Sequence, residues 1–372
     1  MITENLDAVT LFVCGDLMTG RGIDQILPHP SDPRLFEPYA SSALEYVALV
    51  ERTAGRIPRP VGFEYVWGDA LSELRRVGPD ARIVNLETAV TTSPDARPDK
   101  DIHYRMHPAN LPCLTAAGVD CCVLANNHVL DWGHAGLHDT LDALHTVGIR
   151  TAGAGVDQTR AQAPAVIDVP GKARLLVFAF ALPTSGVPRS WRAGQRRAGV
   201  NWVADLSAAC AESIGRQIAP FRRPGDITLA SIHWGGNWGY AISPAERDFA
   251  HRLIDIAEVD LIHGHSSHHP KGIELYRRRC ILYGCGDLLN DYEGIGGYES
   301  FRPELSLMYF PTIEPGSGEL LALTMTPMQV QRMRLDSAAS DAAAWLEATL
   351  DRECQSLGTR IARGSNGMLL LQ

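Results

Sequence analysis

The chain lacks any apolar run approaching the roughly 20 residues that a helix needs to span a bilayer. Its first ten residues include the acidic Glu4 and Asp7 and do not show the basic-then-apolar pattern of a secretion signal. Basic runs are short and the formal net charge is −9, so the sequence offers little to neutralise a phosphate backbone. We therefore expect a cytoplasmic protein with no membrane span and no affinity for nucleic acid.

The eight cysteines include no Cys-x-x-Cys pair, and several lie inside apolar runs such as residues 121–124. This distribution is typical of small buried hydrophobic residues in a reducing compartment and excludes a disulfide framework. The 372 residues are 45% apolar and 21% charged, as in an ordinary globular protein. Because no linker, repeat or low-complexity segment is present, we expect one main domain over residues 1–330. Residues 331–372 are expected to form a helical extension packed on it.

Apolar spacing predicts strands that alternate with helices along most of the chain. The expected strands are residues 9–14, 82–84, 121–124, 174–181, 227–232, 261–262 and 280–283. The expected helices are residues 37–51, 67–77, 111–117, 134–147, 203–221 and 244–257. Two alternating strands, 305–314 and 320–328, then flank a Pro-Gly-Ser-Gly hairpin turn, and a last helix covers 338–355. This order predicts an α/β fold with much parallel pairing.

Histidines gather in loops that follow expected strands. Residues 264–269 read Gly-His-Ser-Ser-His-His and follow the apolar run 259–263. His128 and His233 also come directly after strands, at the sheet edge where open α/β folds place their chemistry. Each of these loops alone is compatible with an ordinary hydrogen-bonded histidine. Three histidine-bearing loops that all follow strands favour a metal site, because neutral imidazole is the commonest metal ligand.

Two carboxylates occupy similar positions. Asp16 and Glu87 each follow a strand, and oxygen together with imidazole suits Zn, Mn or Fe better than Mg or Ca. The alternatives are a helix N-cap for Asp16 and an arginine pair for Glu87. Asp287, Asn290 and Asp291 follow another strand and form either a cavity wall or a simple turn.

The motifs in order resemble the calcineurin-like metallophosphoesterase superfamily, and more closely its CapA-like, poly-γ-glutamate capsule biosynthesis branch. The resemblance extends over about residues 9–300. Asn-Asn-His at 126–128, with Asp-x-Gly at 131–133, is its most specific element. The other matching segments are residues 12–18, 84–87, 233–235, 264–265, 272–276 and 281–287.

The resemblance implies a four-layer α/β/β/α sandwich with one or two divalent transition metal ions at the strand ends. It assigns His128 to the leaving group as a histidine that does not bind metal. The implied metal ligands are Asp16, Glu87 as the bridging carboxylate, Asn127, His233, His265 and His268.

The chain departs from the superfamily pattern at two places. Met18 stands where the first motif has a histidine, and the second histidine of the last motif is offset by one residue, onto His268 instead of Ser267 or His269. One metal position therefore keeps only Asp16, Glu87 and His268. We expect that position to be weak, open or empty, unless another residue such as His269 or Asp287 completes it. A weak position is compatible with a one-metal enzyme or with a protein that binds without hydrolysing.

Two residues are candidates for substrate binding. Arg105 would present a guanidinium to an anionic group, or is an ordinary surface arginine. Trp234, with Trp238 and Tyr240, lines a pocket or packs as an aromatic loop.

The leading functional hypothesis is a metal-dependent hydrolase that cleaves a phosphoester or a γ-glutamyl-type amide in a small anionic substrate. The alternatives are a non-catalytic accessory role in the synthesis or transport of a poly-γ-glutamate-like polymer, and a metal-free anion binder. The substrate, the metal and the oligomeric state stay open at this stage.

Overall fold

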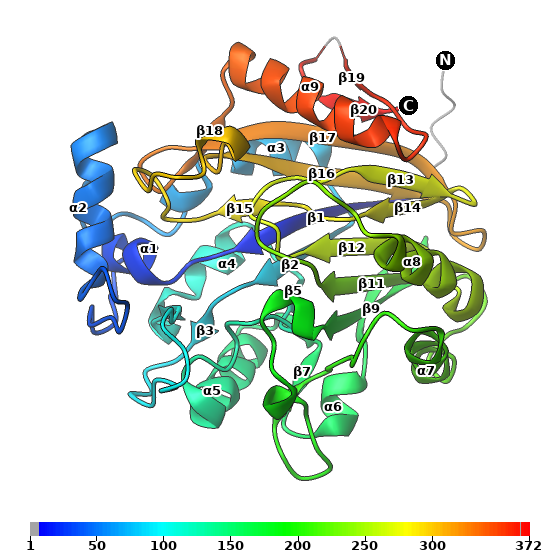
Figure 1. Cartoon of the computed structure of the whole chain (residues 1–372), viewed down its shortest axis with the longest axis horizontal. Coiled ribbons are helices and arrows are strands. Elements are labelled where there is room, and N and C mark those ends of the chain that lie inside the picture. The colour runs from blue at the N-terminus through cyan, green and yellow to red at the C-terminus, as the bar shows by residue number, and fades with distance from the viewer. Residues whose placement is uncertain (1–6, 365) are drawn as a thin grey trace.

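Two β-sheets lie face to face at the centre of the molecule, and helices cover their outer faces (Figure 1). The computed structural model describes residues 7–364 and 366–372. The expected four-layer α/β/β/α sandwich is confirmed. Among the described residues, no helix has both the length and the apolar character needed to cross a membrane.

The larger sheet is built around β1, which has a parallel neighbour on one side and an antiparallel neighbour on the other. On the parallel side the strands follow in the order β2, β5 and β6. On the other side the order is β16, β17, β20 and β19, and each of these strands is antiparallel to the one before it. The bounds are β1 Val9–Leu17, β2 Ala81–Leu86, β5 Cys121–Val123, β6 Arg150–Ala152, β16 Leu305–Ile313, β17 Leu320–Val330, β19 Ile361–Arg363 and β20 Leu369–Leu371. In addition, β15 (Asp287–Leu289) pairs with the end of β1, and β18 (Leu335–Ser337) pairs with β17.

The smaller sheet has the order β13-β14-β12-β11-β9-β8, with parallel central strands and an antiparallel strand at each edge. The bounds are β8 Ala165–Val169, β9 Ala173–Ala181, β11 Ile227–His233, β12 Leu261–His265, β13 Ile273–Tyr276 and β14 Arg279–Leu282. Two short pairs lie outside both sheets: β3 (Ala89–Val90) with β4 (Arg105–Met106), and β7 (Ala154–Gly155) with β10 (Gly199–Val200).

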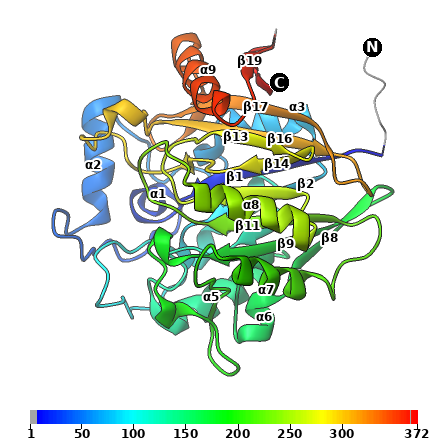
Figure 2. The same ribbon diagram turned by 45° about the vertical axis from the view of Figure 1, so that its right-hand side comes forward.

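Alternation along β9 explains how the smaller sheet sits between two apolar layers. Leu175 and Val177 join the core between the sheets, whereas Leu176 and Phe178 join the layer under helices α7 and α8 (Figure 2). Each such burial contributes about 1.5–3 kcal/mol. The helices are α1 Arg21–Ile26, α2 Ala43–Ala54, α3 Ala70–Val77, α4 Pro112–Ala116, α5 Gly133–Thr146, α6 Gln158–Gln162, α7 Ala208–Ile218, α8 Pro244–Ala257 and α9 Ser340–Gln355.

Capping residues decide where the helices begin. The expected helix over 244–257 has the same bounds as α8, where Ser243 and Glu246 form a capping box. The helix expected from residue 37 begins only at Ala43, because Ser42 and Glu45 form another capping box. The helix expected from residue 203 begins at Ala208 for a similar reason, since the Ser207 side chain accepts from the backbone of Cys210.

The segment 331–372 contributes more than a helix. It contains α9 together with β18, β19 and β20, and β20 extends the larger sheet by pairing with β17. Three-residue strands carry too few residues for an alternation pattern, so the sequence indicated only the helix. The boundary proposed at residue 330 stays a prediction.

A close backbone contact joins β1 to β15. The amide of Asp16 donates to the carbonyl of Gly286 at 2.9 Å, and Asp16 lies in register with Asp287. A Cβ atom on Gly15 would lie 1.6 Å from that same carbonyl oxygen. Glycine at position 15 therefore allows the two strands to come close enough to place two aspartates side by side.

We expect Gly15→Ala to lower the free energy of unfolding by about 3 kcal/mol or more, because the new methyl group must displace backbone atoms. Urea denaturation followed by circular dichroism measures the loss. Gly62→Ala is the matched control, since its Cβ would meet open space. A Gly15→Ala protein as stable as the control would show that β15 does not approach β1 in this way.

Candidate metal centre

The carboxyl ends of strands from both sheets converge on one buried cluster of side chains. Asp16 is the penultimate residue of β1, and Glu87 and Asn127 follow β2 and β5 of the same sheet. His233 and His265 are the last residues of β11 and β12 in the facing sheet, where they pair in register. The structure therefore brings together residues that lie more than 200 positions apart.

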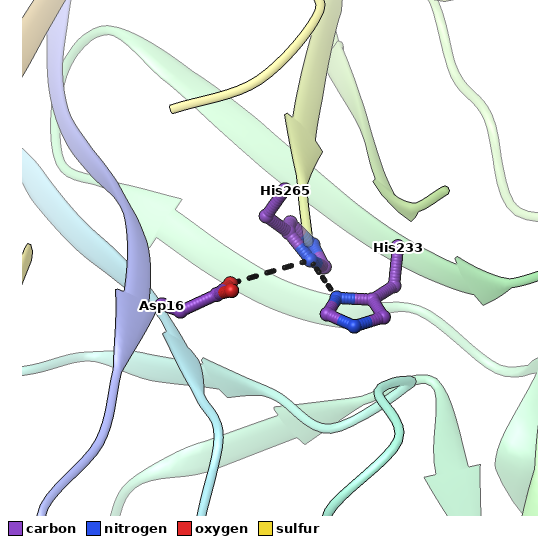
Figure 3. A group of neighbouring side chains, drawn as sticks. All are labelled: Asp16, His233 and His265. Carbon is purple, nitrogen blue, oxygen red and sulfur yellow. Dashed lines mark hydrogen bonds and ion pairs between the residues drawn. The ribbon is translucent and has the colours of Figure 1, made fainter. Parts of the chain in front are cut away.

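The first group within the cluster consists of Asp16, His233 and His265 (Figure 3), with ligand atoms within 4.8 Å of one another. The Nδ1 atom of His265 lies 4.0 Å from Oδ1 of Asp16 and 2.7 Å from Nδ1 of His233. Asn127 adjoins this group, with its Oδ1 3.1 Å from Nε2 of His233.

A second group consists of Asp16, His268 and Asp287, again with ligand atoms within 4.8 Å of one another. Nδ1 of His268 lies 2.8 Å from Oδ1 of Asp287. Burial is the largest influence and lowers the pKa of His268, but the Asp287 carboxylate and the charge of Asp16 together raise this pKa above its usual value. Asp16 belongs to both groups, so it is the carboxylate between them. From the sequence, Asp287 belongs to a wall or turn or completes the weakened metal position, and it repeats the Gly-Asp pair of residues 15–16.

A hydrogen-bonded chain fixes the proton on His265. Nε2 of His263 lies 2.6 Å from the carbonyl of Cys14, which only accepts, so His263 carries its proton there. Burial lowers the pKa of His263 to about 4, so its Nδ1 is an acceptor for the Ser231 hydroxyl at 3.1 Å. The Ser231 oxygen then accepts from Nε2 of His265 at 2.7 Å. Nδ1 of His265 is left with a free lone pair facing Asp16 and His233.

His233 cannot satisfy both of its neighbours with one proton. Burial lowers its pKa well below the usual value, so the ring is neutral and carries a single N–H. One nitrogen faces the lone pair of His265 and the other faces the amide oxygen of Asn127. One of these contacts therefore sets a lone pair against a lone pair, an arrangement that a bound cation relieves.

The two carboxylates beside these histidines also lack compensation. Oδ2 of Asp16 and Oε2 of Glu87 are buried and find no hydrogen-bond partner among the described residues. Burial raises the pKa of Asp16 to about 6. Burial, followed by repulsion from Asp16, raises the pKa of Glu87. Buried oxygens of this kind are costly unless a cation pairs with them. The donor set therefore fits a metal ion.

His128 lies next to this cluster and outside both groups. Its ring stacks on Tyr104 with centroids 4.0 Å apart, and its Nδ1 lies 2.7 Å from Oδ2 of Asp131. Its Nε2 points to the cluster, 3.5 Å from Oε1 of Glu87. Burial lowers the pKa of His128 to about 4, although Asp131 opposes this shift. The ring is thus neutral, with its proton on Nδ1 and an acceptor at Nε2.

Two adjoining cavities give access to the cluster. The first, about 260 Å³, is lined by Glu87, Lys100, Asn127, His128 and His268 among others. The second, about 160 Å³, shares the lining residues Tyr104, Asn237, His268 and Tyr292 with the first. Its wall is aromatic and includes Trp238 stacked on Tyr298 with centroids 4.0 Å apart.

The family of the chain follows from a comparison with known proteins. A family model described as the bacterial capsule synthesis protein PGA_cap matches residues 10–292. The chain belongs to this family. The expected resemblance to CapA-like proteins is thereby confirmed.

Curated relatives of this PGA_cap protein carry related names. A probable polyglutamine synthesis accessory protein of Mycobacterium tuberculosis is 47% identical over 98% of this chain and 96% of its own length. The capsule biosynthesis protein CapA of Bacillus anthracis is 23% identical over 77% of this chain and 60% of its own length. The PGA biosynthesis protein CapA of Bacillus subtilis is 23% identical over 78% of this chain and 65% of its own length.

Both residues expected to bind substrate have other surroundings in this PGA_cap protein. Arg105 donates to the backbone carbonyls of Ser93 and Asp32 and lies 3.8 Å above the ring of Trp132, so its guanidinium is occupied away from the cluster. Trp234 is buried under α8, and its Nε1 donates to the carbonyl of Tyr283. Neither residue lines the cavities beside the cluster, and a role of either in substrate binding stays a prediction.

We expect His265 of the metal-free PGA_cap protein to carry its proton on Nε2, because the Cys14 carbonyl orients the whole chain of donors. Nitrogen-15 chemical shifts of the imidazole report the tautomer. Ser231→Ala removes the hydroxyl that accepts from Nε2 of His265, so we expect a mixture of tautomers in this variant. Ser306→Ala is the matched control, since this buried hydroxyl has no hydrogen-bond partner among the described residues. A pure Nδ1–H tautomer in the unsubstituted protein would contradict the assignment.

Proposed function

We propose that this protein is a metal-dependent hydrolase that cleaves a phosphoester or a γ-glutamyl-type amide in an anionic substrate. The observation that carries the proposal is the buried group of Asp16, His233 and His265. In it Oδ2 of Asp16 has no hydrogen-bond partner among the described residues, and Nδ1 of His265 keeps its lone pair. Such a donor set supports binding of a divalent transition metal, of the kind represented by Mn, Zn or Fe. The names of the relatives, which refer to polyglutamine and capsule synthesis, support a γ-glutamyl substrate.

Asp16, Asn127, His233 and His265 would hold the metal, with Glu87 beside them. When bound, a metal ion at such a site lowers the pKa of water to about 7 and polarises the electrophile. The Ser231–His263 pair supports this role by keeping Nδ1 of His265 unprotonated. Partners of this kind, behind the direct ligands, orient histidines in many metal sites.

His128 would move the proton. In the resting protein its Nε2 is an acceptor, because the single ring proton lies on Nδ1 and is donated in a hydrogen bond to Asp131. A bound anionic substrate would raise the pKa of the ring, since nearby negative charge favours imidazolium. His128 would then donate from Nε2 to the leaving group. Lys100, which lines the same cavity, would attract the substrate anion.

We expect His265→Ala and His233→Ala to strip most of the metal from the purified protein, because each removes one ligand from a small set. Mass spectrometry of metal content after dialysis measures the loss. His269→Ala serves as the matched control, since both ring nitrogens of His269 already bond to backbone atoms. Unchanged metal content in both site variants would refute the proposed ligands.

We expect His128→Ala to keep its metal and fold but to lose rate by roughly 10²–10⁴-fold on substrates with poor leaving groups. The loss should be much smaller on activated esters or amides, whose leaving groups need no proton. Rates on paired phosphoester and γ-glutamyl amide substrates test this difference. Equal losses on both types would indicate a positioning role, and loss of metal would make His128 a ligand.

A second candidate function is a non-catalytic accessory role in the synthesis or transport of a poly-γ-glutamate-like polymer. The name of the M. tuberculosis relative favours this alternative. The two functions differ in turnover: a metal-loaded accessory protein would bind γ-glutamyl chains without cleaving them. Neighbouring genes for a capsule synthetase would favour the accessory role.

A further inference from the structure

We propose that Asp287 completes a second metal position together with Asp16 and His268, in place of the histidine that the superfamily has at Met18. This inference rests on the metal-dependent function proposed above. On this proposal, Asp287 of β15 supplies a ligand that the motif at residues 12–18 lacks.

Met18 cannot take the place of the missing histidine. Its side chain is buried in the apolar core, and a thioether is a soft and weak donor. Its backbone amide donates to the carbonyl of Leu289 in β15. The segment around Met18 is therefore held against β15, and β15 in turn provides Asp287.

The pairing of β15 with β1 places Asp287 where a ligand is needed. Asp16 and Asp287 lie opposite each other in a parallel register, fixed by the hydrogen bond from Asp16 to Gly286. Asn290 donates from Nδ2 to Oδ2 of Asp287 at 2.8 Å, which orients the carboxylate. The other oxygen of Asp287, Oδ1, faces His268.

Charge also points to a cation at this position. Asp16, Glu87 and Asp287 bring three carboxyl groups into one buried space. Oδ2 of Asp16, a residue only 2% exposed, has no hydrogen-bond partner among the described residues. A buried carboxylate oxygen without a partner is destabilising, and a divalent ion bound by Asp16, His268 and Asp287 would pair with Oδ2 of Asp16.

A competing role for Asp287 is to orient His268 without touching the metal. In that case Nδ1–H of His268 donates to Asp287 while Nε2 faces the ion, an arrangement common behind metal-binding histidines. The two roles differ in whether charge is required. Asp287→Asn keeps an oxygen that accepts the same hydrogen bond but removes the negative charge, so it separates a ligand from an orienting residue.

The experiment titrates the metal-free protein with Mn²⁺ and follows binding by calorimetry and by electron paramagnetic resonance, in which two neighbouring Mn²⁺ ions give a coupled spectrum. We expect two ions and a coupled spectrum for the unsubstituted protein. Asp287→Asn should bind one ion, with the second affinity at least 100-fold weaker and the coupled spectrum lost. His268→Ala should show the same loss, which keeps the test decisive if the Asp287 variant folds poorly.

Asp226→Asn is the matched control, because Asp226 pairs with Arg174 just before β11, at the end of that strand opposite His233. It should bind both ions. Two coupled ions in Asp287→Asn would overturn the proposal and make Asp287 an orienting residue. One ion in both the unsubstituted protein and Asp287→Asn would also overturn it, while leaving the proposed function intact. No Mn²⁺ bound to the unsubstituted protein would refute the proposed function itself.

Discussion

Burial of negative charge where the two sheets meet is the constraint on which the rest of this site depends. The carboxyl groups of Asp16, Glu87 and Asp287 are all buried. The lysine and arginine that line the adjoining cavities are already engaged: Lys100 pairs with Asp131, and Arg21 pairs with Glu37 and Asp291. His268 pairs with Asp287, but one oxygen of Asp16 and one of Glu87 keep no hydrogen-bond partner among the described residues. A cation from outside the chain would pair with those two oxygens.

Both sheets contribute side chains to the buried cluster. The larger sheet supplies the carboxylates and the amide, and the smaller sheet supplies the histidines at the ends of β11 and β12. The bond from His263 to the carbonyl of Cys14 crosses between the sheets. It therefore does two things at once, since it links the two halves of the sandwich and sets the proton on a candidate ligand.

The sequence predicted the parts of the site that repeat a local pattern. Asp16, His233 and His265 each lie at or next to the end of a strongly apolar strand, and parallel strands that end at one edge bring such residues together. Asp287 was harder to identify, because β15 has three residues and its role depends on pairing with a strand 270 positions earlier. The contacts of Arg105 and Trp234 could not be predicted from the sequence either. Their partners are backbone carbonyls, which are the same in every residue and leave no trace in the sequence.

The exchange of partners along β1 has a consequence beyond the metal cluster. Up to Val13 the strand pairs with β16, and from Asp16 onward β15 takes that side, so the sheet forks at Gly15. The chain that leaves this fork after β15 carries Tyr292 and Tyr298 into the wall of the aromatic cavity. One branch point thus governs both the positions of Asp16 and Asp287 and the shape of the entrance. The start of the loop between β15 and β16 is fixed, because Asn290 orients Asp287 and Asp291 pairs with Arg21. The exposed residues 296–300 further along can change in composition, and so reshape the entrance, without touching these contacts.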